Sequence, residues 1–233
     1  MNSGSAITDQ QPPRRHGGRA DTRQHLLDTA GEIFAERGYD AVKGQEICLR
    51  AGVNGAAINY HFGGMERLYE AVLREARGRM PSAEALLAAA PESAEPEVRL
   101  RALLALVIAT VTGPTSKTWV LRLLGREAIA PSPIFQRLLL EPELLPKIAV
   151  LKSIIAGLTG LPVGHPAVAR GCLSVFAPCQ MMLLASPLLF QRGYPEISLD
   201  EPDAQAMLDH LTAFSLGGLA AIAAREASRS VFG

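Results

Sequence analysis

Residues Asn54–His61 combine small, amide and aromatic side chains in an order that suits contact with double-stranded DNA. The small residues come first and would let a helix approach base edges closely, with alanine methyls against thymine methyls. One turn later, Asn59 carries an amide that can pair with adenine through two hydrogen bonds. Tyr60 and His61 can donate hydrogen bonds to phosphate oxygens, which would fix register rather than sequence preference. The predicted DNA contacts in this run are Asn54, Gly55, Ala56, Ala57, Asn59, Tyr60 and His61.

Each of these side chains also has an ordinary structural explanation. Asn59 can be a solvated helix residue, and Tyr60 and His61 can pack against a neighbouring helix. Lys43 and Arg67 flank the motif and are interpreted either as phosphate contacts or as solvated charges. We include Lys43 among the predicted DNA-binding residues.

The surrounding residues predict a helix-turn-helix around this run. Apolar residues recur at helical spacing in 26–34, and Gly38 follows where a first helix would end. A short second helix is expected to end near Gly52, and Asn54 is a strong N-cap residue for the third helix. A longer fourth helix is expected over Glu66–Arg79. Two short helices joined by a tight turn and braced by longer ones form this motif.

The rest of the chain shows helical periodicity without strand alternation, so the predicted fold class is all-α. We expect an N-terminal three-helix helix-turn-helix DNA-binding domain and a larger helical domain. The predicted parts are a flexible basic arm at 1–20, the helix-turn-helix domain at 21–66 and the larger helical domain at 67–233. The arm carries Arg14, Arg15 and Arg19, which either contact DNA or only keep the tail soluble.

Composition narrows the class of protein. A hydrophobic fraction of 48% excludes wholesale disorder, and 23 Lys and Arg against 23 Asp and Glu leave no basic domain. The polar first residues contain no secretory signal, and the apolar stretch Leu103–Val111 is far too short to cross a bilayer, so no membrane association is expected. Three cysteines without zinc spacing favour a reduced, cytoplasmic protein with no metal.

No catalytic motif is readable, and neither an enzyme activity nor a cofactor is predicted. His165 and Cys172 are seven positions apart, which places them two helical turns from one another and beyond hydrogen-bond reach. Phosphate loops and dinucleotide fingerprints are absent from the sequence.

Two late helices favour a homodimer. The segments 166–185 and 204–224 contain almost no ionisable side chains, so both need burial on most sides. A second chain is the simplest cover, and pairing each helix with its symmetry mate gives a four-helix interface. Leu211 and Leu219 are expected in that interface.

Apolar residues of the larger domain are candidates for an effector cavity. Any one of them can equally be ordinary core, and Arg126 can equally belong to a structural ion pair. The predicted effector-binding residues are Val107, Val111, Trp119, Leu123, Arg126, Phe176 and Gln180.

The stretch Arg23–Tyr69 resembles the DNA-binding domain of the TetR family of transcriptional regulators. The resemblance rests on Leu27, Ala30, Phe34, Gly38-Tyr39, Ile47, Ala51-Gly52-Val53, Tyr60-His61-Phe62, Glu66 and Leu68, with matching spacing. The segments AGVNGAAINYHFGG, REAIAPSP and FAPCQMM are similar to CecR-like members. The chain departs from the family at Met65, where a lysine is common, and at Gly55 and Gly63.

The resemblance implies that the larger helical domain at 67–233 is an effector-binding (ligand-binding) and dimerisation domain. It also implies a homodimer that represses genes from a double-stranded DNA operator and is released when a small-molecule effector binds. We expect an apolar or amphipathic effector. The alternative is a helical ligand-binding or interaction protein whose DNA binding is weak or vestigial.

Overall fold

The computed structural model describes residues 19–113, 118–184, 191–197 and 201–231. Helices make up 78% of the structure, and these residues contain no strand, so the predicted all-α class is confirmed. The remaining residues, which include Arg14 and Arg15 of the predicted arm, lie outside the described part.

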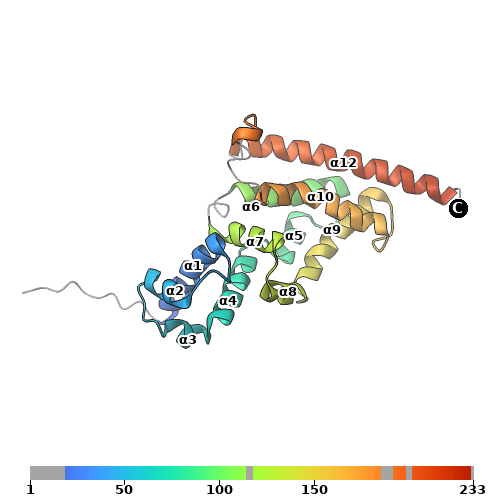
Figure 1. The fold of residues 1–233 in the computed structure, drawn as a ribbon. Coiled ribbons are helices and arrows are strands. Elements are labelled where there is room, and N and C mark those ends of the chain that lie inside the picture. The colour runs from blue at the N-terminus through green and yellow to red at the C-terminus, as the bar shows by residue number, and fades with distance from the viewer. Residues whose placement is uncertain (1–18, 114–117, 185–190, 198–200, 232–233) are drawn as a thin grey trace, which may run out of the picture.

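Four helices form the amino-terminal part of the molecule (Figure 1). They are α1 (Arg19–Arg37), α2 (Gly44–Arg50), α3 (Ala57–Phe62) and α4 (Met65–Gly78). Gly38 follows α1 with a φ of 78°, and Gly63 follows α3 with a φ of 79°, so both helices end at left-handed residues that only glycine adopts readily. Arg19 of the predicted arm therefore lies in the first turn of α1.

The third helix begins later than predicted from the N-cap residue Asn54. The α-helix begins at Ala57, and the Asn54 carbonyl and side chain organise a turn ahead of it. Asn54 Oδ1 accepts from the Ala56 N–H at 2.8 Å, and the Asn54 carbonyl accepts from the Ala57 N–H at 2.9 Å. Asn54 thus caps the turn that leads into the helix.

The larger part contains the remaining labelled helices. They are α5 (Ala83–Ala89), α6 (Pro96–Thr112), α7 (Trp119–Ile129), α8 (Pro133–Leu139), α9 (Leu144–Thr159), α10 (Pro166–Leu184) and α12 (Glu201–Val231). Helices α5 and α8, with seven residues each, were not predicted from the sequence. Their serine caps were readable: Ser82 Oγ accepts from the Ala85 N–H at 3.2 Å, and Ser132 Oγ accepts from the Phe135 N–H at 3.1 Å.

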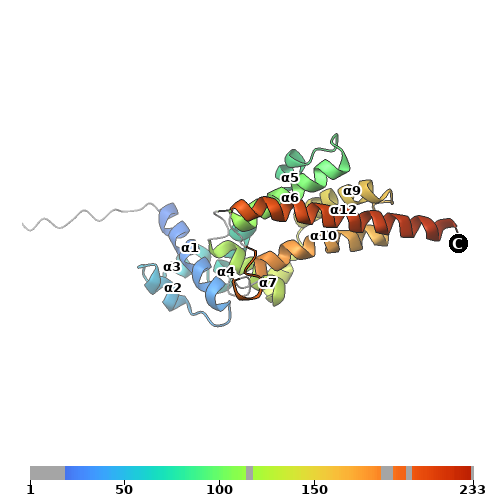
Figure 2. The ribbon, with the colours of Figure 1, turned by 90° about the horizontal axis from the view of Figure 1, so that it is seen from above.

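Two hydrophobic cores divide the molecule, and they do not follow chain order. The first core joins α1–α4 to residues of α7 and α8, including Trp119, Leu123 and Leu138. The second core is formed by α5, α6, α9, α10 and α12. Helix α7 packs against α1 and α4 and also contacts α10, and it lies between the two groups of helices (Figures 1 and 2). A helix from the middle of the chain therefore completes the core of the amino-terminal part.

Helix α12 is the longest, with 31 residues, and it runs along one side of the molecule to the carboxyl end (Figure 2). Its segment Asp203–Arg229 is long and apolar enough to cross a membrane by length and composition alone, and 22% of the apolar window is buried. One face of α12 packs on α6, α9 and α10, and most of the apolar window is not covered by the described residues. The prediction that no segment spans a membrane rested on the stretch Leu103–Val111 and did not include this one.

The placement of α12 corrects the residues expected in a dimer interface. Leu211 and Leu219 are buried in the second core of their own chain. The outward face carries Phe214, which is 67% exposed. Helical periodicity showed that α12 is apolar nearly all round, but only its packing shows which side is already covered.

Candidate nucleic-acid interface

Helix α3 presents the predicted DNA contacts on one exposed face. Ile58 and Phe62 are buried in the first core, and this fixes the rotation of the helix. With that face turned inward, Asn59 and Tyr60 are exposed, while His61 is half-buried. The turn before the helix exposes Asn54, Gly55 and Ala56, and Ala57 is half-buried. The small residues and Asn59 therefore share the face that a major groove would meet.

The turn between α2 and α3 is held by backbone bonds. The Val53 N–H donates to the Cys48 carbonyl at 2.9 Å, and Gly52 adopts a φ of 64°. Gly44, at the start of α2, lies close to α3 and α4, because a Cβ there would be 3.3 Å from Ile58 Cδ1 and 3.2 Å from Met65 Sδ. The two helices of the motif are thus fixed relative to each other.

The two departures from the family pattern after α3 have structural causes. Met65 packs against the first core, so it replaces a common phosphate-binding lysine with a buried contact. Gly63 has the left-handed conformation that ends α3, and a Cβ there would lie 3.1 Å from Arg67 Nη1. Neither Met65 nor Gly63 carries a charge, so any contact with phosphates depends on positively charged residues elsewhere.

Five arginines between residues 19 and 80 form ion pairs. Arg37 pairs with Glu46, Arg50 with Glu32 and Glu36, Arg74 with Glu70 and Glu141, Arg77 with Glu141 and Glu143, and Arg79 with Asp28. In the described part of the chain, the other four cations of this segment have no carboxylate within ion-pair distance: Arg19, Arg23, Lys43 and Arg67. All four are exposed. The neutral sum of charge in the sequence therefore conceals four cations free to meet phosphates.

Two of these cations lie directly beside α3. The Arg19 guanidinium stacks over the Tyr60 ring, with Cζ 4.9 Å from its centroid, and the Arg23 guanidinium stacks over the Phe62 ring at 4.8 Å. Such cation–π contacts position a guanidinium without neutralising its charge. From the sequence, Arg19 was placed in a tail and Arg23 was missed. Their spacing of four residues, which puts them on one face of α1, was the available signal.

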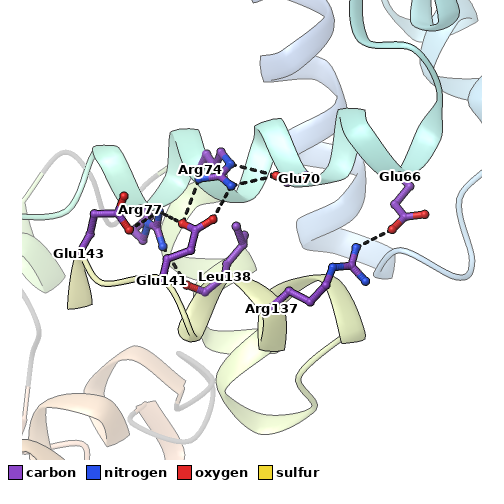
Figure 3. Close-up of polar contacts among 8 residues, drawn as sticks. All are labelled: Glu66, Glu70, Arg74, Arg77, Arg137, Leu138, Glu141 and Glu143. Carbon is purple, nitrogen blue, oxygen red and sulfur yellow. Dashed lines mark hydrogen bonds and ion pairs between the residues drawn. The ribbon is translucent and has the colours of Figure 1, made fainter. Parts of the chain in front are cut away.

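Behind the exposed face, α4 is attached to α8 and to the α8–α9 link (Figure 3). Arg74 and Arg77 both bind Glu141, and the Arg77 Nη1 group also donates to the Leu138 carbonyl at 3.1 Å. Arg137 of α8 pairs with Glu66 at the start of α4. The hydrogen bonds from Arg74 and Arg77 hold the pKa of Glu141 below its ordinary value.

The predicted effector-binding residues do not meet at one place. Val111 is buried in the second core, and Val107 and Phe176 pack against it. Trp119 and Leu123 belong to the first core, and Arg126 donates to the Arg37 carbonyl at 3.2 Å. Gln180 is exposed.

An open cleft of about 520 Å³ lies at the far end of α12. It is lined by the end of α9, by His165 and by the last turns of α12, including Glu226 and Arg229. None of the predicted effector-binding residues lines it.

The pair considered for catalysis has structural roles. His165 Nδ1 accepts from the Ala167 N–H at 3.2 Å at the start of α10. Cys172 is buried, and burial raises the pKa of its thiol, which disfavours the nucleophilic thiolate. Among the described residues, no three His, Cys, Asp or Glu side chains gather as a metal site.

An exposed helix with small residues, an amide and flanking cations, held by a tight turn on a second helix, defines a helix-turn-helix DNA-binding protein. Comparison with known families agrees. Residues 26–72 match the bacterial regulatory proteins of the tetR family, and residues 96–219 match the C-terminal domain of the HTH-type transcriptional dual regulator CecR. The second match spans more than half of the chain, so this protein belongs to the TetR family, with a CecR-type C-terminal domain. It is a DNA-binding transcriptional regulator and not an enzyme.

Two characterised regulators share parts of the chain. It is 43% identical over 56 residues to the transcriptional activator FasR of Mycolicibacterium smegmatis, covering 24% of this chain and 26% of FasR. It is 33% identical over 98 residues to the transcriptional repressor NicS of Pseudomonas putida, covering 40% of this chain and 45% of NicS. The chain thus spans less than half the length of these relatives.

The fold is similar to that of AibR, whose structure was solved with isovaleryl coenzyme A and operator DNA. The TM-score is 0.60 at 19% sequence identity, and the match covers 82% of this chain and 98% of AibR. At this identity the likeness shows the fold alone.

Proposed function

We propose that this protein is a homodimeric, cytoplasmic repressor that binds a double-stranded DNA operator through α3 and is released by a small apolar or amphipathic effector. The observation that carries the DNA-binding role is the exposed face of α3, bordered by four cations that have no carboxylate partner among the residues the structure describes. Asn59 reads a base, and Tyr60, His61 and Lys43 hold phosphates. Gly55, Ala56 and Ala57 permit close approach, and Asn54 shapes the turn before them.

The proposed functional division lies near the start of α4: 21–66 supplies the DNA contacts, and the effector and the partner subunit bind within 67–233. Helices α4, α7 and α8 of this second segment pack with α1–α3 in the first core and are not proposed to bind the effector. NicS is named a repressor and FasR an activator; the match to NicS is the longer, at 98 residues against 56, and this is the support for repression. AibR, with a similar fold, was crystallised with an acyl-coenzyme A ester, and this supports an amphipathic acyl compound as effector. We place the effector site near Val107, Val111 and Phe176, whose apolar side chains lie in or against the second core.

The proposed dimer uses the outward faces of α10 and α12. Leu173 and Met181 of α10 are exposed, as is Phe214 of α12. Gly217 and Gly218 lie in the middle of α12, where each costs about 1 kcal/mol relative to alanine, yet a Cβ at either position would meet nothing within 4 Å. No contact with the described residues explains these glycines, whereas close approach by a partner helix does.

Filter binding of duplex DNA at low salt tests the DNA-binding role, using sites selected from random duplexes. We expect one preferred site, bound in the nanomolar range typical of specific regulators. Failure to enrich any sequence, with no binding above that of a generic basic surface, would favour the alternative of a helical ligand-binding or interaction protein with vestigial DNA binding. If a preferred duplex is found, the compounds that release the protein from it would identify the effector.

The dimer is tested by light scattering on two variants. Phe214→Glu places a charge on the outward face and should give folded monomers. Leu219→Glu buries a carboxylate in the protomer's own core, which costs several kcal/mol, and should reduce helicity instead. A folded dimer in Phe214→Glu would exclude this face as the interface.

A further inference from the structure

Helices α7 and α8 are attached to the DNA-binding half at several points, although they lie in the middle of the larger domain's sequence. We propose that α1–α4, α7 and α8 form one rigid unit, the DNA-binding body, and that buried Glu127 positions α7 and α8 on α4. The other helices, α5, α6, α9, α10 and α12, form the effector body. Only one consequence rests on the proposed function, namely the route by which an effector signal reaches the DNA-binding body.

The first attachment is at the start of α7. The Trp119 indole lies against Gly31 of α1, where a Cβ would be 2.5 Å from two ring atoms, so no larger residue fits. The Arg79 guanidinium, just after α4, lies over the same ring at 5.1 Å. Trp119 is thus fixed between α1 and the end of α4, and it is 4% exposed.

The second attachment is near the other end of α7. Arg126 Nη2 donates to the Arg37 carbonyl at 3.2 Å, at the last residue of α1. Its guanidinium lies against Gly38, where a Cβ would be 2.6 Å from Nε. The negative end of the α1 dipole also stabilises a cation at this position. Helix α7 is therefore attached to α1 at both ends.

The third attachment is buried between α4 and the α7–α8 turn. The Glu127 carboxylate accepts from the Tyr69 hydroxyl of α4, and from the N–H and Oγ of Ser132 at 2.8 and 3.0 Å. Glu127 is 2% exposed, and a buried carboxylate is tolerated only with such donors. Burial, together with the bond to Glu127, raises the pKa of Tyr69, so the phenol remains a donor. Since Ser132 also caps α8, one carboxylate fixes α4, α7 and α8 together.

The fourth attachment is on the surface, where Arg74 and Arg77 of α4 form ion pairs with Glu141, which follows α8 (Figure 3). Exposed ion pairs of this kind contribute less than the buried contacts. Together the four attachments hold α7 against α1 and α4, and α8 against α4. An effector signal would then reach the DNA-binding body through the packing of α7 on α10 or through chain links between the two bodies, such as α4–α5 and α8–α9.

Trp119 is the only tryptophan in the chain, so its fluorescence reports the packing of α7 against α1 and the end of α4. We compare Ile47→Ala in α2 with Leu104→Ala in α6, since both side chains are fully buried but belong to different cores. Ile47→Ala should lower the urea midpoint of the fluorescence transition by about 1 M. Leu104→Ala should leave that midpoint in place while lowering part of the transition seen by circular dichroism.

The reverse pattern, in which only Leu104→Ala shifts the fluorescence, would place α7 in the effector body and overturn the proposal. Equal shifts in both variants would also overturn it, because the chain would then unfold as a single unit. The experiment uses neither DNA nor effector, so its failure is separate from failure of the proposed function.

Hydrogen exchange tests the role of Glu127. In Glu127→Gln and in Tyr69→Phe, amides of α7 and α8 should exchange on the order of tenfold faster, and the double variant should be no faster than either single one. Arg101→Gln, which removes the Arg101–Asp209 ion pair of the effector body, is the matched control and should leave these amides unchanged. Unchanged exchange in both Glu127→Gln and Tyr69→Phe would remove Glu127 from this role, and additive effects would separate it from Tyr69.

Discussion

The α3 side of the amino-terminal part and its remaining surface use arginine in opposite ways. Around α3, Arg19, Arg23 and Arg67 have no carboxylate partner in the described residues, and two of them stack on aromatic rings of α3. Elsewhere, arginines such as Arg50 and Arg79 bridge helices through Glu and Asp. Ion-paired charges stabilise the fold, whereas unpaired exposed ones are available to a polyanion. Counting charges therefore says less about DNA binding than finding which charges are free.

The largest effect is expected from removing the free cations. We expect replacement of all four by Gln to flatten the dependence of log affinity on log salt by about 3.6 per protomer, at about 0.9 for each phosphate that is no longer neutralised. The four are Arg19, Arg23, Lys43 and Arg67. The slope is measured by filter binding at salt concentrations between about 50 and 200 mM.

The matched control replaces Arg37 and Arg50, which are exposed but ion-paired. Their replacement by Gln should lower stability slightly and leave the slope unchanged. If both sets of variants flatten the slope alike, pairing does not distinguish the two surfaces, and the comparison fails.

A smaller effect is expected at the base-reading position. Asn59→Ala should cost about 1 to 3 kcal/mol on the preferred duplex and relax selectivity at one base pair, because the hydrogen bonds it removes go to a base edge. Binding to a panel of single-base variants of the site measures this. A uniform loss across the panel would assign Asn59 to the backbone contacts instead.

Tyr60→Phe should have a still smaller effect, of about 1 kcal/mol, because it removes only one neutral hydrogen bond. The ring under Arg19 remains, so the stacking contact persists. Every duplex in the same panel should weaken equally, since phosphate oxygens are alike under all bases. A selective loss would show that the Tyr60 hydroxyl contacts a base.

The smallest effect concerns the ion pairs behind α3. Because Arg74 and Arg77 depress the pKa of Glu141 below 4.5 in the folded protein, the group contributes stability above that pH and loses it as the pH falls through the depressed value. Wild type should therefore exceed Glu141→Gln in melting temperature near pH 7, and the two should converge under acid. A constant difference at all pH values would mean that the charge of Glu141 does not matter.

The sequence was enough to predict the helix-turn-helix, because its signals are local. Gly38 and Gly52 stand where left-handed residues follow α1 and α2, and Asn54 organises the turn before α3. Small residues followed by Asn59 fall on the exposed face because Ile58 and Phe62, four apart, fix the buried one. All of this information lies within a single continuous segment, and helical spacing converts it directly into position.

Contacts between distant segments were beyond the sequence alone. Periodicity shows that a helix has a buried face but not which helix covers it, so Trp119 was predicted in an effector cavity and instead packs on Gly31. For the same reason Leu211 and Leu219 were assigned to the dimer interface, although both lie in the protomer's own core.

The division of charges also required the tertiary structure, because ion pairs such as Arg79–Asp28 join residues 51 positions apart. The order of residues determined the family, the all-α class and the motif that faces DNA. The three-dimensional packing determined which helices share a core, which face of α12 is free and which arginines remain unpaired. The physical reason is that burial and charge pairing depend on neighbours in space, which a one-dimensional pattern specifies only within a helical turn or two.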